Sequence, residues 1–271
     1  MTLTASPRTL LSPTTYDEPA GVAARATLVV LTGRGETPAG YARLGRRLSA
    51  DAYRVRVVAT DVDDLDAVEA AVTDALGGAA PDDVVRPRVL LGSDAGANVA
   101  ARLAGRRPDL VDALVLAGVV LPGSRPAPGT APGTAPGTAA STAAGPASRW
   151  DEELETRSAC PAYRRVLGED ADFVRGALET ELPAEVAGDD LFAGDLPTLV
   201  LHGEADPLTP VDDVLSLVAD GSRARAAVVA GGRHDVLNDV DHRSVAATVV
   251  LFLESLRRGA DLPTIVAPAD R

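Results

Sequence analysis

The sequence predicts an α/β protein with a doubly wound, mainly parallel sheet and helices on both faces. Short apolar runs alternate with helical stretches along most of the chain, which is typical of strands joined by crossover helices. Such connections are right-handed and place helices on both sides of the sheet. The chain has 271 residues, 46% of them hydrophobic, so it can bury one substantial core.

The elements follow from this alternation in order along the chain. Strands are expected at residues 27–31, 54–59, 88–91, 113–116, 198–201 and 226–229. Helices are expected at residues 38–52, 65–76, 95–104, 211–219 and 239–258, with Gly259 as the stop of the last helix.

Two segments interrupt the alternation and divide the chain into four parts. Residues 1–25 are expected to be a flexible leader, and residues 26–122 and 191–271 to form the core. Residues 123–148 are almost entirely Ala, Pro, Gly, Thr and Ser, with three tandem Ala-Pro-Gly-Thr units, so a mobile low-complexity loop is expected there. Residues 149–190 predict a helical cap of two or three short helices, interrupted at Pro161 and Pro183.

Charge and cysteine content exclude several function classes. The balance of 26 basic and 39 acidic residues gives a net charge of −13, which argues against binding nucleic acid or an anionic membrane. The single Cys160 allows no internal disulfide and is expected to be an inert buried thiol, and no Cys/His cluster suggests a metal site. A cytoplasmic protein without a cofactor is expected, and the oligomeric state, a homodimer included, stays open.

The segment Gly92-Ser93-Asp94-Ala95-Gly96 places a carboxylate where a strand turns into a helix. Glycines two positions on either side of a residue allow a tight turn and a close approach of strand and helix. An aspartate exposed on such a turn is suited to attack a saturated carbon and form an alkyl ester. An ordinary strand–helix turn is the plain alternative, because short glycine patterns also arise by chance.

Two further polar residues lie beyond predicted strand ends, where catalytic groups of a doubly wound sheet gather. Asp206 follows one strand and would orient a histidine, or would simply cap the helix after it. His234 follows the next strand and is the candidate general base. Of the other two histidines, His202 is expected to be structural and His242 to lie near the surface of the last helix.

In the order nucleophile, acid, histidine, these residues resemble the α/β-hydrolase superfamily. Residues 32–36 (Thr-Gly-Arg-Gly-Glu) with Tyr41 resemble the His-Gly-x-x-Glu-His and following tyrosine segment of monoglyceride-lipase-like and lysophospholipase-like hydrolases. Residues 234–238 (His-Asp-Val-Leu-Asn) resemble the His-Glu-Leu-Leu-Asn stretch of the same group. The resemblance implies an α/β-hydrolase fold and an oxyanion hole formed by the backbone N–H groups of Ala95 and Arg34.

The nucleophile position departs from that group. Asp94 stands where those lipases have serine, and Thr32 replaces a histidine. An aspartate there resembles epoxide hydrolases and haloalkane dehalogenases, whose carboxylate opens an epoxide or displaces halide before histidine activates water. Ala95 replaces the tryptophan that dehalogenases use to bind halide.

The resemblance also indicates substrate-binding residues. Epoxide hydrolases protonate the oxirane oxygen with cap tyrosines, and Tyr163 is the only tyrosine of the expected cap. Trp150 would be a second donor, although packing of the cap is the plainer reading for a large aromatic side chain. Ser93, one position before Asp94, is expected beside the substrate.

Three functions follow from these observations. The first is a cofactor-free hydrolase of a small apolar epoxide or related electrophile, with Asp94 as nucleophile, His234 as base and Asp206 as orienting acid. The second keeps ester or lysophospholipid-like substrates, with Asp94 as a base. The third is a repurposed lyase, cyclase or ligand-binding protein. The identity of the substrate does not follow from the sequence.

Overall fold

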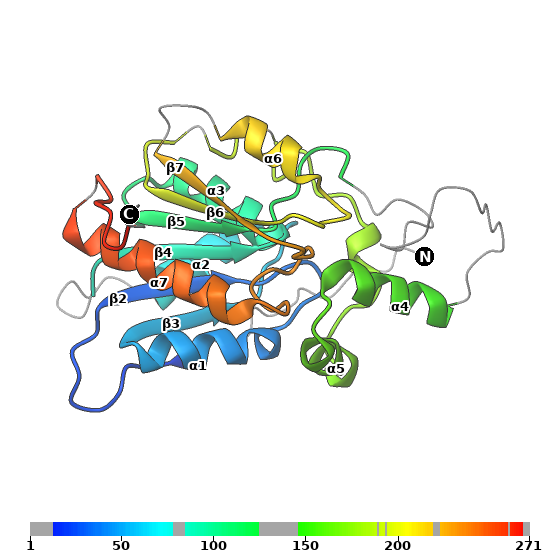
Figure 1. The fold of residues 1–271 in the computed structure, drawn as a ribbon, viewed down its shortest axis with the longest axis horizontal. Coiled ribbons are helices and arrows are strands. Elements are labelled where there is room, and N and C mark those ends of the chain that lie inside the picture. The colour runs from blue at the N-terminus through cyan, green and yellow to red at the C-terminus, as the bar shows by residue number, and fades with distance from the viewer. Residues whose placement is uncertain are drawn as a thin grey trace, which may run out of the picture.

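The computed structural model describes residues 13–77, 85–124, 146–188, 190–192, 194–218, 223–259 and 261–267. It confirms the doubly wound α/β class, with a seven-stranded sheet in the order β1-β3-β2-β4-β5-β6-β7 (Figure 1). The strands are β1 (Thr14–Tyr16), β2 (Ala26–Leu31), β3 (Tyr53–Val58), β4 (Arg88–Ser93), β5 (Ala113–Ala117), β6 (Thr198–Gly203) and β7 (Ala224–Val229). The core helices are α1 (Ala42–Ala50), α2 (Leu65–Ala75), α3 (Ala95–Arg106), α6 (Val211–Leu217) and α7 (His242–Arg258), and a 3₁₀ turn, η1 (Pro38–Tyr41), precedes α1.

The strands β2 to β7 pair in parallel, as the alternation predicts. The exception is β1, which pairs antiparallel with β3 at the edge and lies inside the segment expected to be a flexible leader. The ring of Tyr16 packs against Gly45 of α1, where a side chain would leave it no room. Three residues are too few to show the alternation that identifies a strand, so this element has no sequence signal.

Helices cover both faces of the sheet (Figure 1). Apolar residues of α1 and α7, such as Leu48 and Val249, share one core with alternate residues of β2. Residues of α2 and α3, such as Val72 and Leu103, pack with the intervening residues on the opposite face. Neighbouring strand residues therefore face different cores, which explains why the central strands are apolar throughout.

The last helix begins later than expected. It starts at His242 rather than at residue 239, because Asp239 uses its carboxylate outside the helix. Its Oδ1 accepts from the Ser158 hydroxyl at 3.0 Å and from the Ala159 N–H at 2.7 Å, and its Oδ2 accepts from the Arg233 N–H at 2.8 Å. These contacts fix the loop between β7 and α7, which carries His234.

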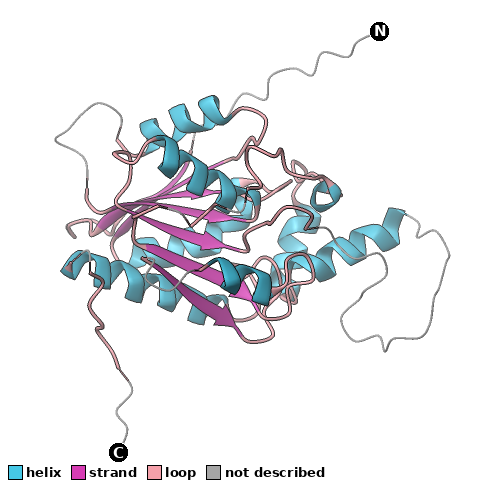
Figure 2. Cartoon of the chain, turned by 90° about the horizontal axis from the view of Figure 1, so that it is seen from above, coloured by secondary structure: helices cyan, strands magenta, loops and turns pink. Residues whose placement is uncertain are grey.

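The expected cap consists of α4 (Pro146–Arg157), α5 (Pro161–Glu169) and the 3₁₀ turn η3 (Ala177–Glu179). Figures 1 and 2 place these helices beyond the carboxyl ends of the parallel strands. Pro161 separates α4 from α5 and occupies the first turn of α5. The backbone N–H that proline lacks would have no partner within the helix at this position. Most of the low-complexity segment, residues 125–145, lies outside the described residues.

Across the described ranges, no helix is both long enough and apolar enough to span a membrane.

Candidate active site

Asp94 occupies a sharp turn between β4 and α3. Its φ of 51° and ψ of −128° lie in a region that non-glycine residues rarely adopt. A side chain at position 92 would collide with the backbone of Gly96, and one at position 96 would collide with the carbonyl of Leu31. The glycine spacing is thus a steric requirement of this turn, and the strained conformation projects Asp94 beyond the strand end as a nucleophile elbow does.

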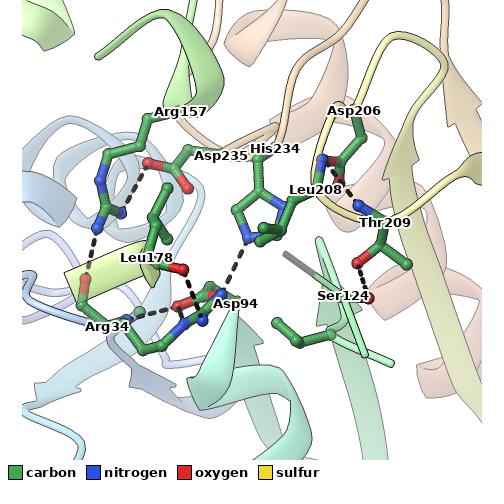
Figure 3. A network of polar contacts seen from close by, with 12 residues as sticks. Arg34, Asp94, Ser124, Arg157, Leu178, Asp206, Leu208, Thr209, His234 and Asp235 are labelled. Atoms are coloured by element: carbon green, nitrogen blue, oxygen red, sulfur yellow. Dashed lines mark hydrogen bonds and ion pairs between the residues drawn. The ribbon is translucent and has the colours of Figure 1, made fainter. Parts of the chain in front are cut away.

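The structure brings the three residues singled out in the sequence into contact. His234 Nε2 lies 3.0 Å from Asp94 Oδ1, and His234 Nδ1 lies 2.8 Å from Asp206 Oδ2. Asp94 and His234 are fully buried. Figure 3 shows the imidazole between the two carboxylates, each from a different strand end. The order of these contacts is that of a nucleophile–base–acid triad, with a carboxylate in the first position.

Asp206 is held by backbone donors of the turn that follows it. The N–H groups of Leu208 and Thr209 lie 2.8 and 3.3 Å from Asp206 Oδ1, which leaves Oδ2 for His234. His202 Nε2 lies 2.8 Å from the Thr209 carbonyl and 3.2 Å from Asp206 Oδ2. His202 therefore supports this turn from its buried strand end, whereas His242 opens α7.

Arg34 contacts Asp94 through its backbone and its side chain. Its N–H donates to Asp94 Oδ2 at 2.6 Å, as one half of an oxyanion hole would. Its Nη2 donates to Oδ1 at 2.7 Å, and its Nε lies 3.0 Å from Oδ2. The N–H of Ala95, the other residue assigned to the oxyanion hole, has no acceptor among the described residues. The sequence indicated the backbone role of Arg34, but its side-chain contact had no signal.

The charges around His234 set its protonation and that of both carboxylates. Burial raises the pKa of Asp94, but the charges and hydrogen bonds of Arg34 and His234 outweigh this and hold it well below its usual value. Burial likewise opposes ionisation of Asp206, yet His234 lowers its pKa. Burial lowers the pKa of His234, and the two carboxylates, Asp206 first, more than reverse this and raise it to about 10. At neutral pH the site thus holds an imidazolium between two carboxylates.

A buried ionic network joins the cap to this site and was not anticipated from the sequence. The Arg157 side chain, at the end of α4, is fully buried, and its Nη2 donates to the Arg34 carbonyl at 2.7 Å. Its Nε lies 3.1 Å from Glu153 Oε1, and its Nη1 lies 3.4 Å from Asp235 Oδ2 and 3.8 Å from Glu36 Oε1. The one available signal was the i,i+4 spacing of Glu153 and Arg157.

The same cap helix holds the histidine loop through its backbone. The N–H of His234 donates to the Thr156 carbonyl at 3.3 Å, and the N–H of Asp235 donates to the Arg157 carbonyl at 2.8 Å. Burial and the charge of Glu36 raise the pKa of Asp235 well above its usual value, against the opposing charge of Arg157. The end of α4 thereby fixes the position of the imidazole.

The residues expected at the substrate have other partners. The Tyr163 hydroxyl donates to Glu36, and Trp150 packs against Phe173, with ring centroids 5.4 Å apart. Ser93 is buried at the end of β4 and its hydroxyl interacts with the Tyr41 hydroxyl. Among the described residues, none of these three side chains forms a hydrogen bond to the Asp94 carboxylate, and their binding of substrate stays a prediction.

A cavity of about 180 Å³ lies beside the candidate oxyanion hole. Its walls include Arg34 and Ala95, the segment 60–63, and the cap residues Ala177 and Thr180. Asp94 and His234 do not line it. Within the described ranges no cluster of three or more His, Cys, Asp or Glu residues suits a metal ion.

The parallel sheet, the strained elbow and the Asp94–His234–Asp206 contacts together define an α/β hydrolase. Residues 22–241 match the family model described as "Serine aminopeptidase, S33" (Hydrolase_4), and the chain belongs to that family. The family description names a serine enzyme, whereas Asp94 occupies the elbow in this chain. A search of curated protein sequences found no match.

Solved structures show the same fold at low sequence identity. A monoacylglycerol lipase from Paleococcus ferrophilus is 18% identical, with a TM-score of 0.65 over 91% of this chain and 98% of that one. A monoglyceride lipase from Saccharomyces cerevisiae is 15% identical, with a TM-score of 0.62 over 91% and 89%. A meta-cleavage product hydrolase from Pseudomonas fluorescens is 17% identical, with a TM-score of 0.58 over 90% and 94%. At these identities the likeness concerns the fold.

Proposed function

We propose that the protein is a cofactor-independent hydrolase that opens a small apolar epoxide, or a related electrophile, through an alkyl ester on Asp94. The observation that supports this proposal is the ionisation of the Asp94 carboxylate. It is ionised at the elbow, with Oδ2 on the Arg34 N–H and Oδ1 facing His234. A carboxylate attacks a saturated carbon readily, whereas attack on an ester carbonyl would produce an anhydride.

In the first step Asp94 Oδ1 forms a bond to an epoxide carbon and the C–O bond of the ring breaks. The carboxylate becomes a neutral ester, so one of the two negative charges that hold the proton on His234 disappears. The pKa of His234 then falls, and its proton passes through solvent to the alkoxide. The step ends with a hydroxyalkyl ester on Asp94 and a neutral imidazole.

In the second step neutral His234 takes a proton from water, and the hydroxide adds to Cγ of Asp94. The N–H groups of Arg34 and Ala95 would stabilise the oxyanion that forms there. The bond between Cγ and the substrate oxygen breaks, and the diol leaves after taking the proton of the new carboxylic acid. Asp94 is again a carboxylate and His234 an imidazolium, so the cycle is balanced. Asp206 holds the imidazole throughout.

Hydrolysis of carboxylic esters is the second candidate, with Asp94 as a base toward water. The family match and the lipases among the similar structures favour it. The low pKa of Asp94 opposes it, because a weakly basic carboxylate removes a proton from water inefficiently. Ester hydrolysis that is lost in Asp94→Ala but retained in Ser93→Ala would support this candidate over the first.

Intact-mass analysis of the His234→Gln variant tests the first candidate. After incubation with a panel of small epoxides and alkyl halides, an increase equal to the whole epoxide, or to the alkyl group, is expected on Asp94. Asp94→Asn in the same background is the matched control and should remain unmodified. Absence of an adduct across the panel, together with ester turnover by the wild type, would overturn the epoxide proposal. Ligand binding without turnover would instead indicate a repurposed, non-hydrolytic protein.

A further inference from the structure

Arg34 connects the candidate nucleophile to the cap. Its Nε and Nη2 contact both carboxylate oxygens of Asp94, while its Nη1 donates to the carbonyls of Leu178 and Thr180 at 3.2 and 2.8 Å. Leu178 lies in η3, and Thr180 follows it directly. Figure 3 shows the guanidinium against the Asp94 carboxylate, with a dashed line that joins it to Leu178. One side chain therefore binds the elbow and the cap segment at the same time.

Arg34 lines the neighbouring cavity, whereas Asp94 does not. Arg34, Ala95 and Thr180 line the space of about 180 Å³, whereas Asp94 is fully buried. Both oxygens of Asp94 are already occupied, Oδ1 by Arg34 Nη2 and His234, and Oδ2 by Arg34 alone. Because Asp94 does not line the cavity, a molecule there can reach it only if a lining residue moves, and Arg34 is the lining residue whose side chain binds both carboxylate oxygens.

Displacement of the guanidinium would leave both side chains with hydrogen-bond partners. Asp94 would keep the Arg34 N–H at 2.6 Å and His234 at 3.0 Å. The guanidinium would keep its two carbonyl acceptors in the cap segment. Removing one partner of a buried ion pair is costly because it leaves a lone buried charge, and His234 reduces that cost for Asp94. The geometry favours movement of Arg34 with the cap residues and away from the elbow.

We propose that the Arg34 side chain is a latch that covers Asp94 in the empty site and that a substrate in the adjacent cavity must displace. The inference rests on the proposed function, because it assumes that Asp94 is the group to be reached. It assigns to Arg34 a positioning role that is separate from its backbone N–H. The latch ties access to Asp94 to the position of residues 178–180.

The rate of adduct formation on Asp94 tests the latch. The wild type is compared with Arg34→Met during the first turnover, using styrene oxide as the probe and quenched-flow intact mass as the readout. His234 stays in both proteins, because it is the second group that holds Asp94 ionised. Methionine retains bulk but cannot bind the carboxylate, so the adduct should form roughly tenfold faster in Arg34→Met. Arg46→Met is the matched control and should equal the wild type, because Arg46 is exposed on α1. An equal or slower rate with Arg34→Met would overturn the latch.

Hydrogen exchange of residues 174–182 separates failure of the latch from failure of the proposed function. If styrene oxide labels none of the variants, the proposed chemistry fails for this probe, and exchange alone decides on the latch. Exchange of this segment should be several times faster in Arg34→Met than in the wild type, because its tie to the elbow is lost. Unchanged exchange would overturn the latch. Exchange of β4 and β5 reports whether the variant is folded.

Discussion

The Arg34 guanidinium and the Asp94 carboxylate form a fork in which Nη2 lies 2.7 Å from Oδ1 and Nε lies 3.0 Å from Oδ2. Both side chains are buried, and the Arg34 N–H adds a third contact to Oδ2 at 2.6 Å. Charge-assisted, bidentate contacts of this kind are among the stronger hydrogen bonds in proteins. Together with His234 they keep Asp94 ionised, so its chemistry is that of a carboxylate anion.

The raised pKa of His234 predicts a loss of stability at alkaline pH. The pKa rises from 6.5 to about 10 on folding, so the native state binds the proton more tightly than the unfolded chain. The added stability is complete below pH 6.5 and disappears as the pH rises through 10. Each pKa unit corresponds to about 1.4 kcal/mol, so a decline of a few kcal/mol is expected over this range.

Urea unfolding at several pH values between 6 and 10.5 measures this decline. His234→Gln should show a much flatter dependence, because glutamine carries no titrating proton. His242→Gln is the control and should follow the wild type, because burial and neighbouring arginines lower the pKa of His242 instead of raising it. Parallel alkaline declines in the wild type and His234→Gln would contradict the assignment.

Alanine at the elbow glycines is predicted to disrupt the turn. In Gly92→Ala and Gly96→Ala the new Cβ would collide with backbone carbonyls of Gly96 and Leu31, which cannot move aside as side chains can. A loss of at least about 2 kcal/mol in unfolding free energy, or failure to fold, is expected. Gly105→Ala lies in α3 with open space around its Cβ and should be neutral or stabilising by up to ~1 kcal/mol. Equal thermal stability of all three variants would be inconsistent with the steric explanation.

The elbow could be predicted from the sequence because its constraints are local. Gly92, Gly96 and Asp94 are close in the chain, and the turn needs small residues at fixed positions. His234 and Asp206 could be predicted because strand ends of a parallel sheet converge at one edge. Their contacts with one another required no information beyond the order of the strands.

The partners of Arg34 and Arg157 could not be predicted in the same way. A long side chain has several rotatable bonds, and its partner depends on which segments the cap brings near it. Arg157 meets Asp235 across 78 positions of sequence and Arg34 across 123. The three-residue strand β1 could not be predicted for a different reason. It forms because β3 offers a free edge for pairing, and the sequence of β1 itself shows no strand pattern.

The buried Arg157 is predicted to be essential for stability. Arg157→Met would leave Glu36, Glu153 and Asp235 close together without their shared cation. Breaking a buried ion pair in this way costs about 3–5 kcal/mol. Thermal and urea unfolding measure the loss.

Arg106→Met is the control: its ion pairs with Asp66 and Glu69 lie at the surface, and no measurable change is expected. A mild effect of Arg157→Met would show that the three carboxyl groups are neutral or hydrated without it.

Asp206→Asn is predicted to slow the second chemical step more than the first. The variant loses the charge that contributes most to the raised pKa of His234, so the imidazole becomes a weaker base and is less well oriented. Asp94 keeps the backbone hydrogen bond from Arg34 and can still attack, so ester should accumulate during turnover, whereas the wild type should show little. Removal of the acid of a catalytic triad slows turnover by roughly 10⁴-fold. Quenched-flow mixing followed by intact mass gives both rates. Asp212→Asn, an exposed carboxylate at the start of α6, should match the wild type. If Asp206→Asn instead slowed adduct formation and hydrolysis equally, Asp206 would be acting through the position of Asp94 and not through the basicity of His234.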